Sequence, residues 1–468
     1  MPQIVIAAVP YVDTVEPIMA PALLKAVLHS QNINSVAVDL NIDVVNYIAD
    51  HLESQKLLDF FYSQIIYPEV IEDINYLINY CSEKLIKSNT NIIALSLLTY
   101  SCQIFTRWLC ADLRQKRPDI KIVIGGSGIK NFVADNNTSF VFQLKELGLI
   151  DDFIYGDGEL SLVEYVNGNY DYPGINQFYW NPPPDLNALP LPDYTDYEFS
   201  DYKKILIPIC DSRGCVRDCE FCDIIEHWKK FQFRTAENIF NEMLEQYKKY
   251  NVTYFSFRSS LVNGNLKEFR KLVKLITEFN VGLDNKQQMG WEGYFIIRNE
   301  KTHPAELWRD IKGSNGKLVI GIESVVQHIR HGMGKNFSNE DVDYHLEMSK
   351  QYKVPLILLM IVAYPTETLA DFEFTKRWFR ERAHYANSID FVNLSFAAIL
   401  PGTELDRRVD EYGITKGKLP SIWINQNLNI TPADRKNYLR ELKEVCTQAG
   451  FAALSNEQTL EHTTDELH

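Results

Sequence analysis

Three cysteines follow one another at close spacing near the middle of the chain. Cys215, Cys219 and Cys222 form a C-x-x-x-C-x-x-C pattern directly after the apolar run at residues 205–210. Three thiolates on one loop suit an iron–sulfur cluster, and a cubane held by three cysteines keeps one iron open. A zinc knuckle is the alternative, but structural zinc sites usually need four ligands, and only His227 lies nearby as a candidate fourth. The pattern therefore predicts an iron–sulfur cluster.

The length and composition of the chain narrow the classes of protein to which it can belong. Its 468 residues predict two or three domains. A formal net charge of -15 argues against nonspecific binding to nucleic acid or to an anionic membrane surface. Eight cysteines are too few for a disulfide scaffold in so long a chain, which indicates a reducing, cytoplasmic setting. The N-terminus is expected to be a strand and not a signal peptide, and no apolar run approaches the roughly 18 residues of a membrane span.

Residues 1–168 alternate between short apolar runs and helical patterns. Continuous apolar runs are typical of buried parallel strands, and the expected strands are 4–9, 35–39, 92–98, 121–125 and 153–156. Helices are expected at 20–31, 55–88 and 104–116. This order predicts a doubly wound, Rossmann-like α/β domain, in which ligands bind beyond the carboxyl ends of the strands.

Three stretches converge at that edge of the predicted sheet. Ser96 and Thr99 bound the end of the third strand, Gly125 and Gly126 end the fourth, and residues 10–17 follow the first. Glycines at a strand end let the backbone approach a ligand closely. The simpler interpretation is that the glycine pair only makes the turn.

Residues 169–203 are predicted to form a proline-rich linker. Prolines cluster at 181–184 and 189–192 without any periodicity of apolar residues, which suits an extended spacer. The segment also carries too many aromatic residues for a free linker, so we expect it to wrap over the surface.

The alternation of strands and helices resumes over residues 204–410. Strands are expected at 204–209, 254–257, 288–295, 317–323, 356–362 and 391–397, with helices at 235–249, 266–278, 304–311, 339–351 and 369–385. Six such units predict a partial (β/α)6 barrel with active-site loops at the carboxyl ends of its strands, and the cysteine loop follows the first strand. Residues 411–468 are expected to be a small helical region, in which Thr431 caps a helix and the polar tail after Ser455 frays.

The cysteine motif, with Phe221 directly before its last cysteine, resembles the signature of the radical S-adenosylmethionine (SAM) superfamily. Three further stretches, Gly321–Ser324, Tyr364–Glu367 and Leu400–Thr403, extend the resemblance to the subfamily that carries a cobalamin-binding domain. The resemblance covers roughly residues 3–405. It implies a 4Fe–4S cluster and SAM as cofactors, and a 5′-deoxyadenosyl radical that takes a hydrogen atom from an unactivated C–H bond.

The resemblance also implies roles for single residues of the predicted barrel. Cys215, Cys219 and Cys222 would hold the cluster, and Phe221 would pack against the adenine of SAM. Glu323 would bind the ribose or amino group of SAM, Ser260 (with Ser259) would face SAM, and Arg234 and Arg298 are candidates for its carboxylate. Tyr364 and Glu367 would lie near the substrate. For each polar residue a structural interpretation stays open. Glu323 could bind a neighbouring backbone, the arginines could be surface cations, and Tyr364–Glu367 could be a loop turn.

In the N-terminal domain the resemblance implies that Ser96, Thr99, Gly125 and Gly126 cradle the nucleotide tail of cobalamin. The D-x-H-x-x-G motif of domains that bind cobalt through histidine is absent, because the loop after the first strand holds Asp13 and no histidine. Radical SAM relatives can bind cobalamin without that ligand. Two interpretations therefore remain, a cobalamin site or a retained fold that has lost the ligand.

Two cysteines outside the motif are candidate hydrogen donors to a substrate radical. Cys210 lies just before the motif, and Cys446 lies in the expected C-terminal helix. A buried core thiol is the commoner fate of a free cysteine, and it remains the alternative for each.

The sequence thus favours an enzyme that cleaves SAM reductively and modifies an unactivated carbon. Cobalamin-dependent methyl transfer on a natural-product or peptide substrate is the leading hypothesis. A cobalamin-free radical epimerase or rearranging enzyme with a cysteine hydrogen donor is the second, and a non-catalytic iron–sulfur scaffold protein is the third. A reducing partner such as flavodoxin or ferredoxin is expected, and neither nucleic acid nor a membrane is.

Overall fold

The computed structural model describes residues 2–11, 16–130, 139–178, 184–417 and 420–455. The chain divides into two compact units, Met1–Pro208 and Ile209–His468, which we describe separately. Residues 12–15 of the loop at 10–17 (Asp13 among them), part of the proline cluster at 181–184 and the tail after Ser455 lie outside the described residues. Within the described ranges, no helix is both long and apolar enough to cross a membrane.

The first unit is built on five parallel strands. They are β1 (Ile4–Ala8), β2 (Ser35–Asp39), β3 (Ile92–Ser96), β4 (Lys121–Gly125) and β5 (Asp152–Ile154). Their order in the sheet is β2-β1-β3-β4-β5. This is a doubly wound arrangement whose topological switch point lies between β1 and β3. All five strands were expected from their apolar runs.

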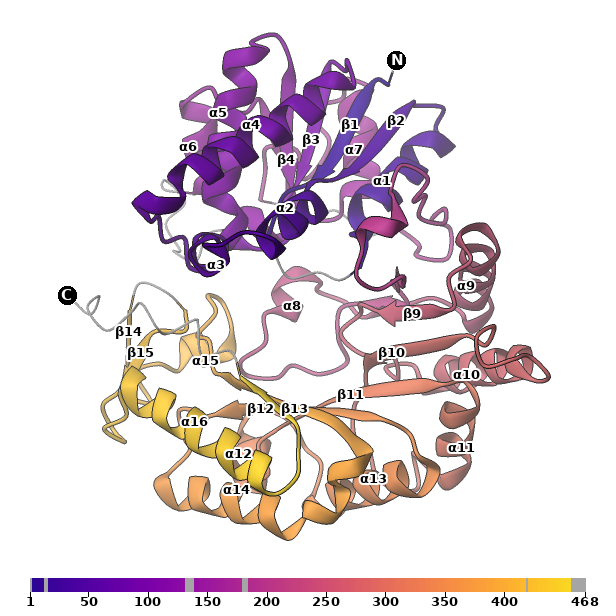
Figure 1. The fold of residues 1–468 in the computed structure, drawn as a ribbon, viewed down its shortest axis with the longest axis vertical. Helices are drawn as coiled ribbons and strands as arrows, with labels where there is room; N and C mark the ends of the chain where they lie inside the picture. Colours follow the sequence, from indigo (N-terminus) through magenta and orange to yellow (C-terminus); the bar gives the residue numbers. More distant parts are fainter. Residues whose placement is uncertain (1, 12–15, 131–138, 179–183, 418–419, 456–468) are drawn as a thin grey trace. The chain divides into compact units, whose positions relative to one another are not determined.

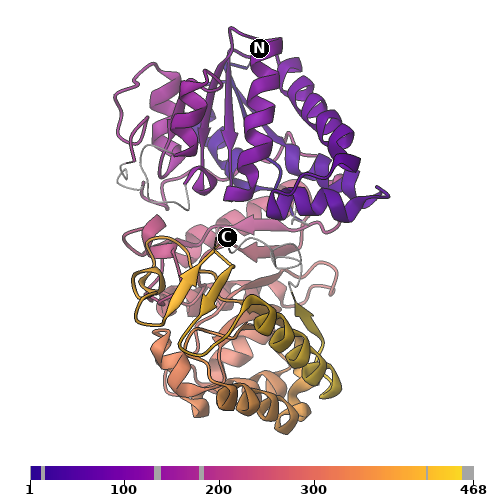
Figure 2. The ribbon, with the colours of Figure 1, turned by 90° about the vertical axis from the view of Figure 1, so that its left-hand side faces the viewer.

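Helices cover both faces of this sheet, which explains why its strands are apolar on both sides (Figures 1 and 2). The helices α1 (Met19–Ser30) and α7 (Gly158–Val166) pack on one face. The helices of the opposite face are α2 (Leu40–Ala49), α3 (Ser54–Ser63), α4 (Ile71–Lys87), α5 (Gln103–Lys116) and α6 (Phe140–Glu146). The single helix expected at 55–88 is in fact α3 and α4, separated at Pro68. Proline cannot donate the helical hydrogen bond, and it disfavours helical geometry in the residue before it.

The proline-rich segment packs onto the first unit, as its aromatic content led us to expect. Lys25 of α1 is buried and forms ion pairs with Asp193 at 3.3 Å and Asp196 at 2.7 Å. The Tyr202 hydroxyl donates a hydrogen bond of 2.8 Å to the Asp39 carboxylate. These buried polar contacts fix the path of the segment over the surface.

The second unit is built on a seven-stranded sheet. Its strands are β6 (Ile207–Ile209), β9 (Tyr254–Phe257), β10 (Gly290–Tyr294), β11 (Gly316–Glu323), β12 (Leu356–Val362), β13 (Ile389–Phe396) and β16 (Ala453–Ser455). They lie in the order β16-β13-β12-β11-β10-β9-β6, and neighbours from β9 to β16 are parallel. Six of the strands were expected, and β16 is an addition. A three-residue strand is too short to show a periodic pattern.

The helices of this unit follow the strands in turn, as a barrel requires (Figure 1). The principal ones are α9 (Ala236–Tyr250), α10 (Leu266–Asn280), α11 (Ala305–Gly313), α13 (Asn339–Tyr352) and α14 (Leu369–Glu381). The C-terminal region contains α16 (Pro432–Gln448), whose start is the expected capping box of Thr431 and Asp434. It also contains a hairpin of β14 (Ile414–Lys416) and β15 (Trp423–Asn425), so this region is not helical alone. The fold class predicted from the sequence, a doubly wound α/β domain followed by a partial barrel, is confirmed.

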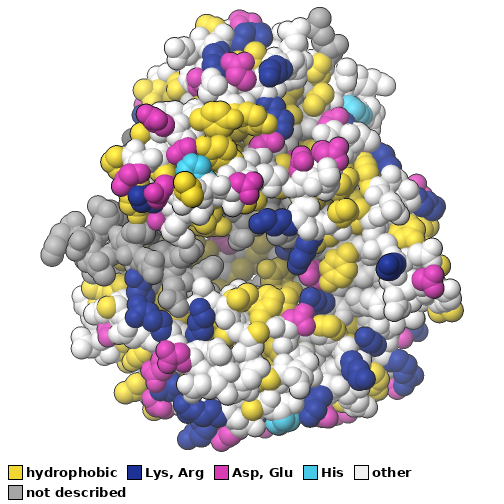
Figure 3. All heavy atoms as spheres, in the orientation of Figure 1, with side chains coloured by type: hydrophobic (Ala, Val, Ile, Leu, Met, Phe, Trp, Pro, Cys, Tyr) yellow, Lys and Arg dark blue, Asp and Glu magenta, His cyan; other side chains and the backbone are white. Residues whose placement is uncertain are grey.

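The surface carries charges of both signs. On the face shown in Figure 3, acidic, basic and hydrophobic side chains are interspersed, and no broad basic field is visible there. This mixture agrees with the excess of acidic residues, 62 Asp and Glu against 47 Lys and Arg.

Candidate functional site

The cysteine loop lies at the carboxyl end of the first barrel strand. It runs between β7 (Ser212–Arg213) and α8 (Ile224–His227), and its three cysteines are half-buried and free of disulfides. The loop begins at Gly214, which has a φ of +79°, and a Cβ there would lie 2.7 Å from the Lys230 carbonyl oxygen. Only glycine therefore fits at the entry to the loop. The Cys222 amide donates to the Cys219 carbonyl at 3.0 Å, which turns the loop between these two cysteines.

The donor set fits a cluster better than it fits a single metal ion. In the described part of the chain, no group of three or more His, Cys, Asp or Glu side chains is arranged to hold one ion. A cubane spreads its cysteines over different irons, so their sulfurs need not converge on one point. The imidazole of His227, the candidate fourth zinc ligand, lies 3.0 Å from the Asp223 carboxylate. These observations favour the cluster over the zinc knuckle.

Burial sets the protonation of the three thiols. It raises the pKa of all three, and that of Cys222 to about 11. Metals bind the thiolate, so occupation of this loop releases protons.

Glu323 ends β11 with its carboxylate nearly buried and paired to a lysine that the sequence did not single out. The Lys335 ammonium donates to Glu323 Oε1 at 2.8 Å and to the Gly321 carbonyl at 2.8 Å. The same ammonium lies 5.8 Å from the centroid of the Phe221 ring, which belongs to the cysteine loop. Burial is the largest single effect on Lys335 and lowers its pKa, but Glu323 together with Cys219 and Cys222 outweighs it, so the pKa is raised and the lysine stays charged. Its only sequence signal is its place twelve residues after Glu323.

The backbone at Glu323 is held in an uncommon conformation. Its φ is +62°, and the pairing of β11 with β12 shifts register between Gly321 and Glu323. A side chain at Gly321 would overlap Glu323 and Lys335. Positive φ in a residue with a side chain is costly and concentrates at functional sites. The irregularity points the Glu323 carboxylate at Lys335 instead of along the regular pleat.

The serines after β9 have different environments. The Ser259 hydroxyl is buried, donates to the Asp211 carboxylate and accepts from the amides of Asp211 and Ser212 at 3.2 and 3.1 Å. Burial raises the pKa of Asp211 to about 6. Ser260 is half-buried, and its hydroxyl makes no hydrogen bond with the described residues. Of the two serines, Ser260 therefore keeps a hydroxyl available for a ligand, and its contact with SAM stays a prediction.

The two arginines predicted for the SAM carboxylate also differ. Arg234 is buried, with its guanidinium bound by the Glu242 carboxylate and by the Cys210 carbonyl at 3.0 Å. Its donors serve the packing of α9. Arg298 follows β10 and makes only long contacts, to the carbonyls of Asn263 at 3.3 Å and Gly264 at 3.5 Å.

Arg298 forms no ion pair with any described side chain. Burial and the nearby charge of Arg217 lower its pKa. A cation beside another cation at the carboxyl end of the sheet is a suitable place for an anion.

Tyr364 and Glu367 form a tight turn after β12. Tyr364 is buried, and its hydroxyl donates to the Glu220 carboxylate at 2.5 Å. Glu367 accepts from the Ala363 amide at 2.6 Å, where Ala363 has a φ of +54°. Burial raises the pKa of Glu367 to about 7. The structural interpretation of this stretch as a loop turn therefore has direct contacts to support it, and a catalytic role for Tyr364 stays a prediction.

The two candidate hydrogen donors lie in different surroundings. Cys446 is fully buried in α16. Cys210 is half-buried at the end of β6, and its thiol lies 3.5 Å from the Ser212 carbonyl. Burial raises the pKa of both thiols, so each carries its hydrogen at neutral pH.

In the first unit, the predicted ligand-binding edge is assembled by the strand register. Ala8, Ser96 and Gly125 lie side by side at the carboxyl ends of β1, β3 and β4. A Cβ at Gly126, whose φ is +95°, would overlap the Leu97 carbonyl. The glycine thus allows the two loops to pack closely, which is the simpler interpretation of the pair.

Thr99 turns its hydroxyl towards Ser101 Oγ at 2.7 Å. Ser96, Thr99 and Gly125 are half-buried and Gly126 is exposed, so a ligand could still reach this edge.

Residues 209–379 match the model of the Radical SAM superfamily. The chain is 26% identical over 273 residues to a Methanocaldococcus jannaschii protein provisionally named as a methylthiotransferase, a match that covers 56% of this chain and 58% of that protein. The chain thus spans less than two thirds of that relative. Both units resemble the solved structures of two enzymes, at sequence identities that show a shared fold alone.

The first enzyme is TsrM, a radical SAM methyltransferase from Kitasatospora setae. Its TM-score is 0.64 at 12% identity, with 94% of this chain and 83% of TsrM covered. The second is OxsB, a cobalamin-dependent SAM radical enzyme, with a TM-score of 0.68 at 11% identity, covering 94% of this chain and 66% of OxsB. The superfamily implies a 4Fe–4S cluster and SAM, which the cysteine loop and the Glu323 site fit. The chain therefore contains a radical SAM domain at residues 209–379.

Proposed function

We propose that the protein is an enzyme that cleaves SAM reductively and uses the resulting radical on an unactivated C–H position. One observation carries the proposal. Lys335 joins the two halves of the site, because its ammonium bonds Glu323 at the end of β11 and lies over Phe221 in the cysteine loop. The cluster loop and the charged end of β11 would together bind SAM, which chelates the open iron through its amino and carboxylate groups and also carries a positive charge.

The residues of this chain would bind and orient the reactants. When bound, the cluster supplies the electron that breaks a sulfur–carbon bond of SAM and yields the 5′-deoxyadenosyl radical. Cys215, Cys219 and Cys222 would hold it. Glu323 keeps Oε2 for the ribose or amino group of SAM, because its Oε1 is occupied by Lys335. Phe221 offers an aromatic face to the adenine.

Three further residues complete the proposed SAM site. Arg298 would bind the carboxylate, and Ser260 would donate one hydrogen bond. Arg234 would hold the residue after β6 in place by donating a hydrogen bond to the Cys210 carbonyl. The packed site would exclude water from the radical.

For the reaction itself, we propose cobalamin-dependent methyl transfer to an unactivated carbon of a natural-product or peptide substrate. The support is the first unit, where the order β2-β1-β3-β4-β5 places Ala8, Ser96 and Gly125 at the switch point at which such sheets bind ligands. Its overall likeness to OxsB and TsrM agrees with this proposal. The electron would come from a reducing partner such as flavodoxin or ferredoxin, in the cytoplasm.

A cobalamin-free epimerase remains the second candidate, because Cys210 is a protonated, half-buried thiol at the end of β6. Such a thiol could return a hydrogen atom to a substrate radical. Cys446 is less suited to this role, since it is fully buried.

Anaerobic reconstitution tests the enzyme proposal. The wild-type protein should bind about four irons per chain and release 5′-deoxyadenosine from SAM once reduced. Cys219→Ala should abolish this release, while Cys81→Ala, which changes a buried thiol of the first unit, should preserve it. Release of 5′-deoxyadenosine by Cys219→Ala would refute the proposal. A wild-type protein that binds the cluster but does not cleave SAM would refute it as well.

Two readouts separate the candidate reactions. A cobalamin spectrum that survives gel filtration favours methyl transfer. Deuterium that enters product from heavy water, and that Cys210→Ala abolishes, favours the epimerase. Unchanged deuterium incorporation in Cys210→Ala excludes that cysteine as the donor.

A further inference from the structure

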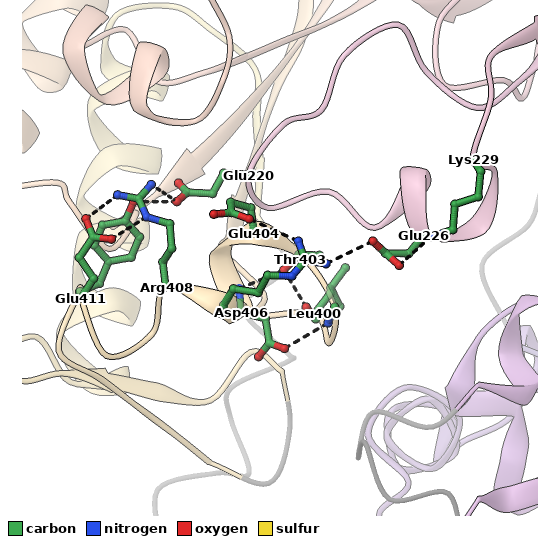
Figure 4. Close-up of polar contacts among 12 residues, drawn as sticks. Glu220, Glu226, Lys229, Leu400, Thr403, Glu404, Asp406, Arg408 and Glu411 are labelled. Atoms are coloured by element: carbon green, nitrogen blue, oxygen red, sulfur yellow. Dashed lines mark hydrogen bonds and ion pairs between the residues drawn. The ribbon is translucent and has the colours of Figure 1, made fainter.

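One acidic residue of the cysteine loop is buried and bound on every side. Glu220 lies between Cys219 and Cys222, and it is 4% exposed. Its Oε1 accepts hydrogen bonds from Arg408 Nη1 at 2.6 Å and from the Tyr412 hydroxyl at 2.7 Å. Its Oε2 accepts from the Tyr364 hydroxyl at 2.5 Å. Figure 4 shows the carboxylate of Glu220 facing the guanidinium of Arg408, which Glu411 holds from the other side.

The backbone of Glu220 is bound as well. Its amide donates to the Met333 carbonyl at 3.1 Å, just after α12 (Gln327–Gly332), and its carbonyl accepts from the Leu405 amide at 2.8 Å in α15 (Glu404–Arg407). Leu405 is fully buried in a hydrophobic cluster against which Phe221 packs. One residue of the loop thus contacts segments that follow β11, β12 and β13.

The cysteine loop is not held in place by regular secondary structure. Residues 214–223, which carry the three cysteines, form no helix or strand. Side-chain and single backbone contacts must therefore fix their position. Burying a carboxylate with its cation gives little net stability compared with an apolar replacement. Its value lies in geometry, because three donors from two separate segments converge on one carboxylate.

We propose that Glu220 is the positioning residue of the cluster loop, and that Arg408 and Tyr412 belong to the cluster site through it. The inference rests on the proposed function, since it assumes that the cysteine loop holds a cluster. Residues that orient metal ligands typically change metal affinity or activity by about 10- to 100-fold when they are removed. Cys219 directly precedes Glu220 and Cys222 follows it two residues later, so a shift of Glu220 is expected to move both ligands.

The test compares Glu220→Ala and Glu220→Gln with the control variant Arg407→Gln in α15. Arg407 neighbours Arg408, but it is exposed and forms ion pairs with Glu404 at 3.3 Å and Glu226 at 3.5 Å. Iron per chain, the electron paramagnetic resonance spectrum of the reduced cluster and the shift of that spectrum on adding SAM are measured for each protein. Circular dichroism and thermal melting of the apo proteins report whether each variant folds.

We expect Glu220→Ala to lose most of its iron, or to hold a cluster with an altered spectrum and a weakened response to SAM. Its SAM cleavage should fall by about 10- to 100-fold. Glu220→Gln should keep more of each property, because an amide oxygen can still accept from Arg408 and Tyr412. Arg407→Gln should match the wild type in all three readouts. If Glu220→Ala does not fold, Tyr412→Phe, which removes one donor only, should show the same spectral change in milder form.

A wild-type spectrum, iron content and SAM response in Glu220→Ala would overturn the inference, and so would an equal loss in Arg407→Gln. If Tyr412→Phe is used, a spectrum and SAM response like those of the wild type would also overturn it. These outcomes leave the proposed function intact, because the wild type still cleaves SAM. A wild-type protein that binds no cluster removes the proposed function and this inference together.

Discussion

The ammonium of Lys335 lies 2.8 Å from Oε1 of Glu323, and both groups are nearly buried at the end of β11. The pair is built on an irregular strand end, with Glu323 at positive φ and Gly321 leaving room for the lysine. Because the ion pair uses one carboxylate oxygen, it fixes the direction of the other. Lys335 therefore orients the carboxylate oxygen of Glu323 that can bind a ligand.

Replacement of this lysine should damage both stability and SAM binding. In Lys335→Met, Glu323 becomes a nearly buried carboxylate without its cation, which costs about 3–5 kcal/mol. We expect the Kd for SAM to rise by tenfold or more, measured by equilibrium binding to the reconstituted protein. Lys317 on the same strand provides the control, because its ion pair with Asp390 is 2.7 Å long but much more exposed. Lys317→Met should cost no more than about 1 kcal/mol and leave SAM binding unchanged. Equal effects in the two variants would contradict a special role for Lys335.

The arginines Arg298 and Arg234 should separate binding from stability. Arg298→Gln should raise the Kd for SAM by about tenfold, since it removes a charge-assisted hydrogen bond, and it should leave the melting temperature nearly unchanged. Arg234→Gln removes the cation of buried Glu242, so it should lower the free energy of unfolding by about 3–5 kcal/mol. Binding titrations and urea unfolding measure the two effects. SAM binding at wild-type strength in Arg298→Gln would remove this residue from the site.

Gly126 should be intolerant of any side chain. In Gly126→Ala, the added Cβ overlaps the Leu97 carbonyl and the residue must also keep a φ of +95°. We expect a loss of about 2 kcal/mol or more in unfolding free energy, from backbone strain and overpacking together. Gly148→Ala is the matched control, because Gly148 has a φ of +66° but no atom within 4 Å of the added Cβ. It reports the strain alone and should cost about 1 kcal/mol. Urea unfolding of both variants measures the difference, and a tolerated Gly126→Ala would show that the two loops can separate.

Glu367 should make stability depend on pH between about 4.5 and 7. Burial raises its pKa from 4.5 to about 7 in the folded protein. The folded state therefore holds this proton more tightly than the unfolded state does. The resulting stability is fully present below pH 4.5 and is lost as the pH rises through 7, by up to about 3 kcal/mol.

Comparison of the wild type with Glu367→Gln isolates this contribution, because the amide can still accept from the Ala363 amide but does not titrate. The wild type should lose stability relative to the variant as the pH increases from 5 to 8. A constant difference across this range would show that Glu367 titrates normally.

Part of the fold was predictable because it depends on local pattern. Short apolar runs gave the strands of both sheets, and the proline and capping residues at Thr431 gave the start of α16. The strand β16 and the hairpin β14–β15 were not predictable, since strands of three residues owe their existence to their neighbours in space. The break between α3 and α4 had a visible signal in Pro68, which the helical pattern around it masked.

The site shows the same division. Spacing alone identified Cys215, Cys219 and Cys222, because all three predicted cluster ligands lie close together in the sequence. Arg234 and Arg298 looked alike as isolated cations. Only their surroundings distinguished the buried ion pair of Arg234 from the guanidinium of Arg298, which bonds backbone carbonyls and pairs with no carboxylate among the described residues. Glu220 carried no sequence pattern, since its partners lie up to 192 residues away along the chain. Lys335 offered only its place twelve residues after Glu323.

The sequence by itself determined most of the strands, the cysteine loop and the resemblance to the radical SAM superfamily. These depend on residue type and spacing, which the chain carries in one dimension. The tertiary structure decided which charged side chains are occupied and which are free to bind. Burial and hydrogen-bond partners set that outcome, and both exist only after distant segments have packed around the loop that contains Cys215, Cys219 and Cys222.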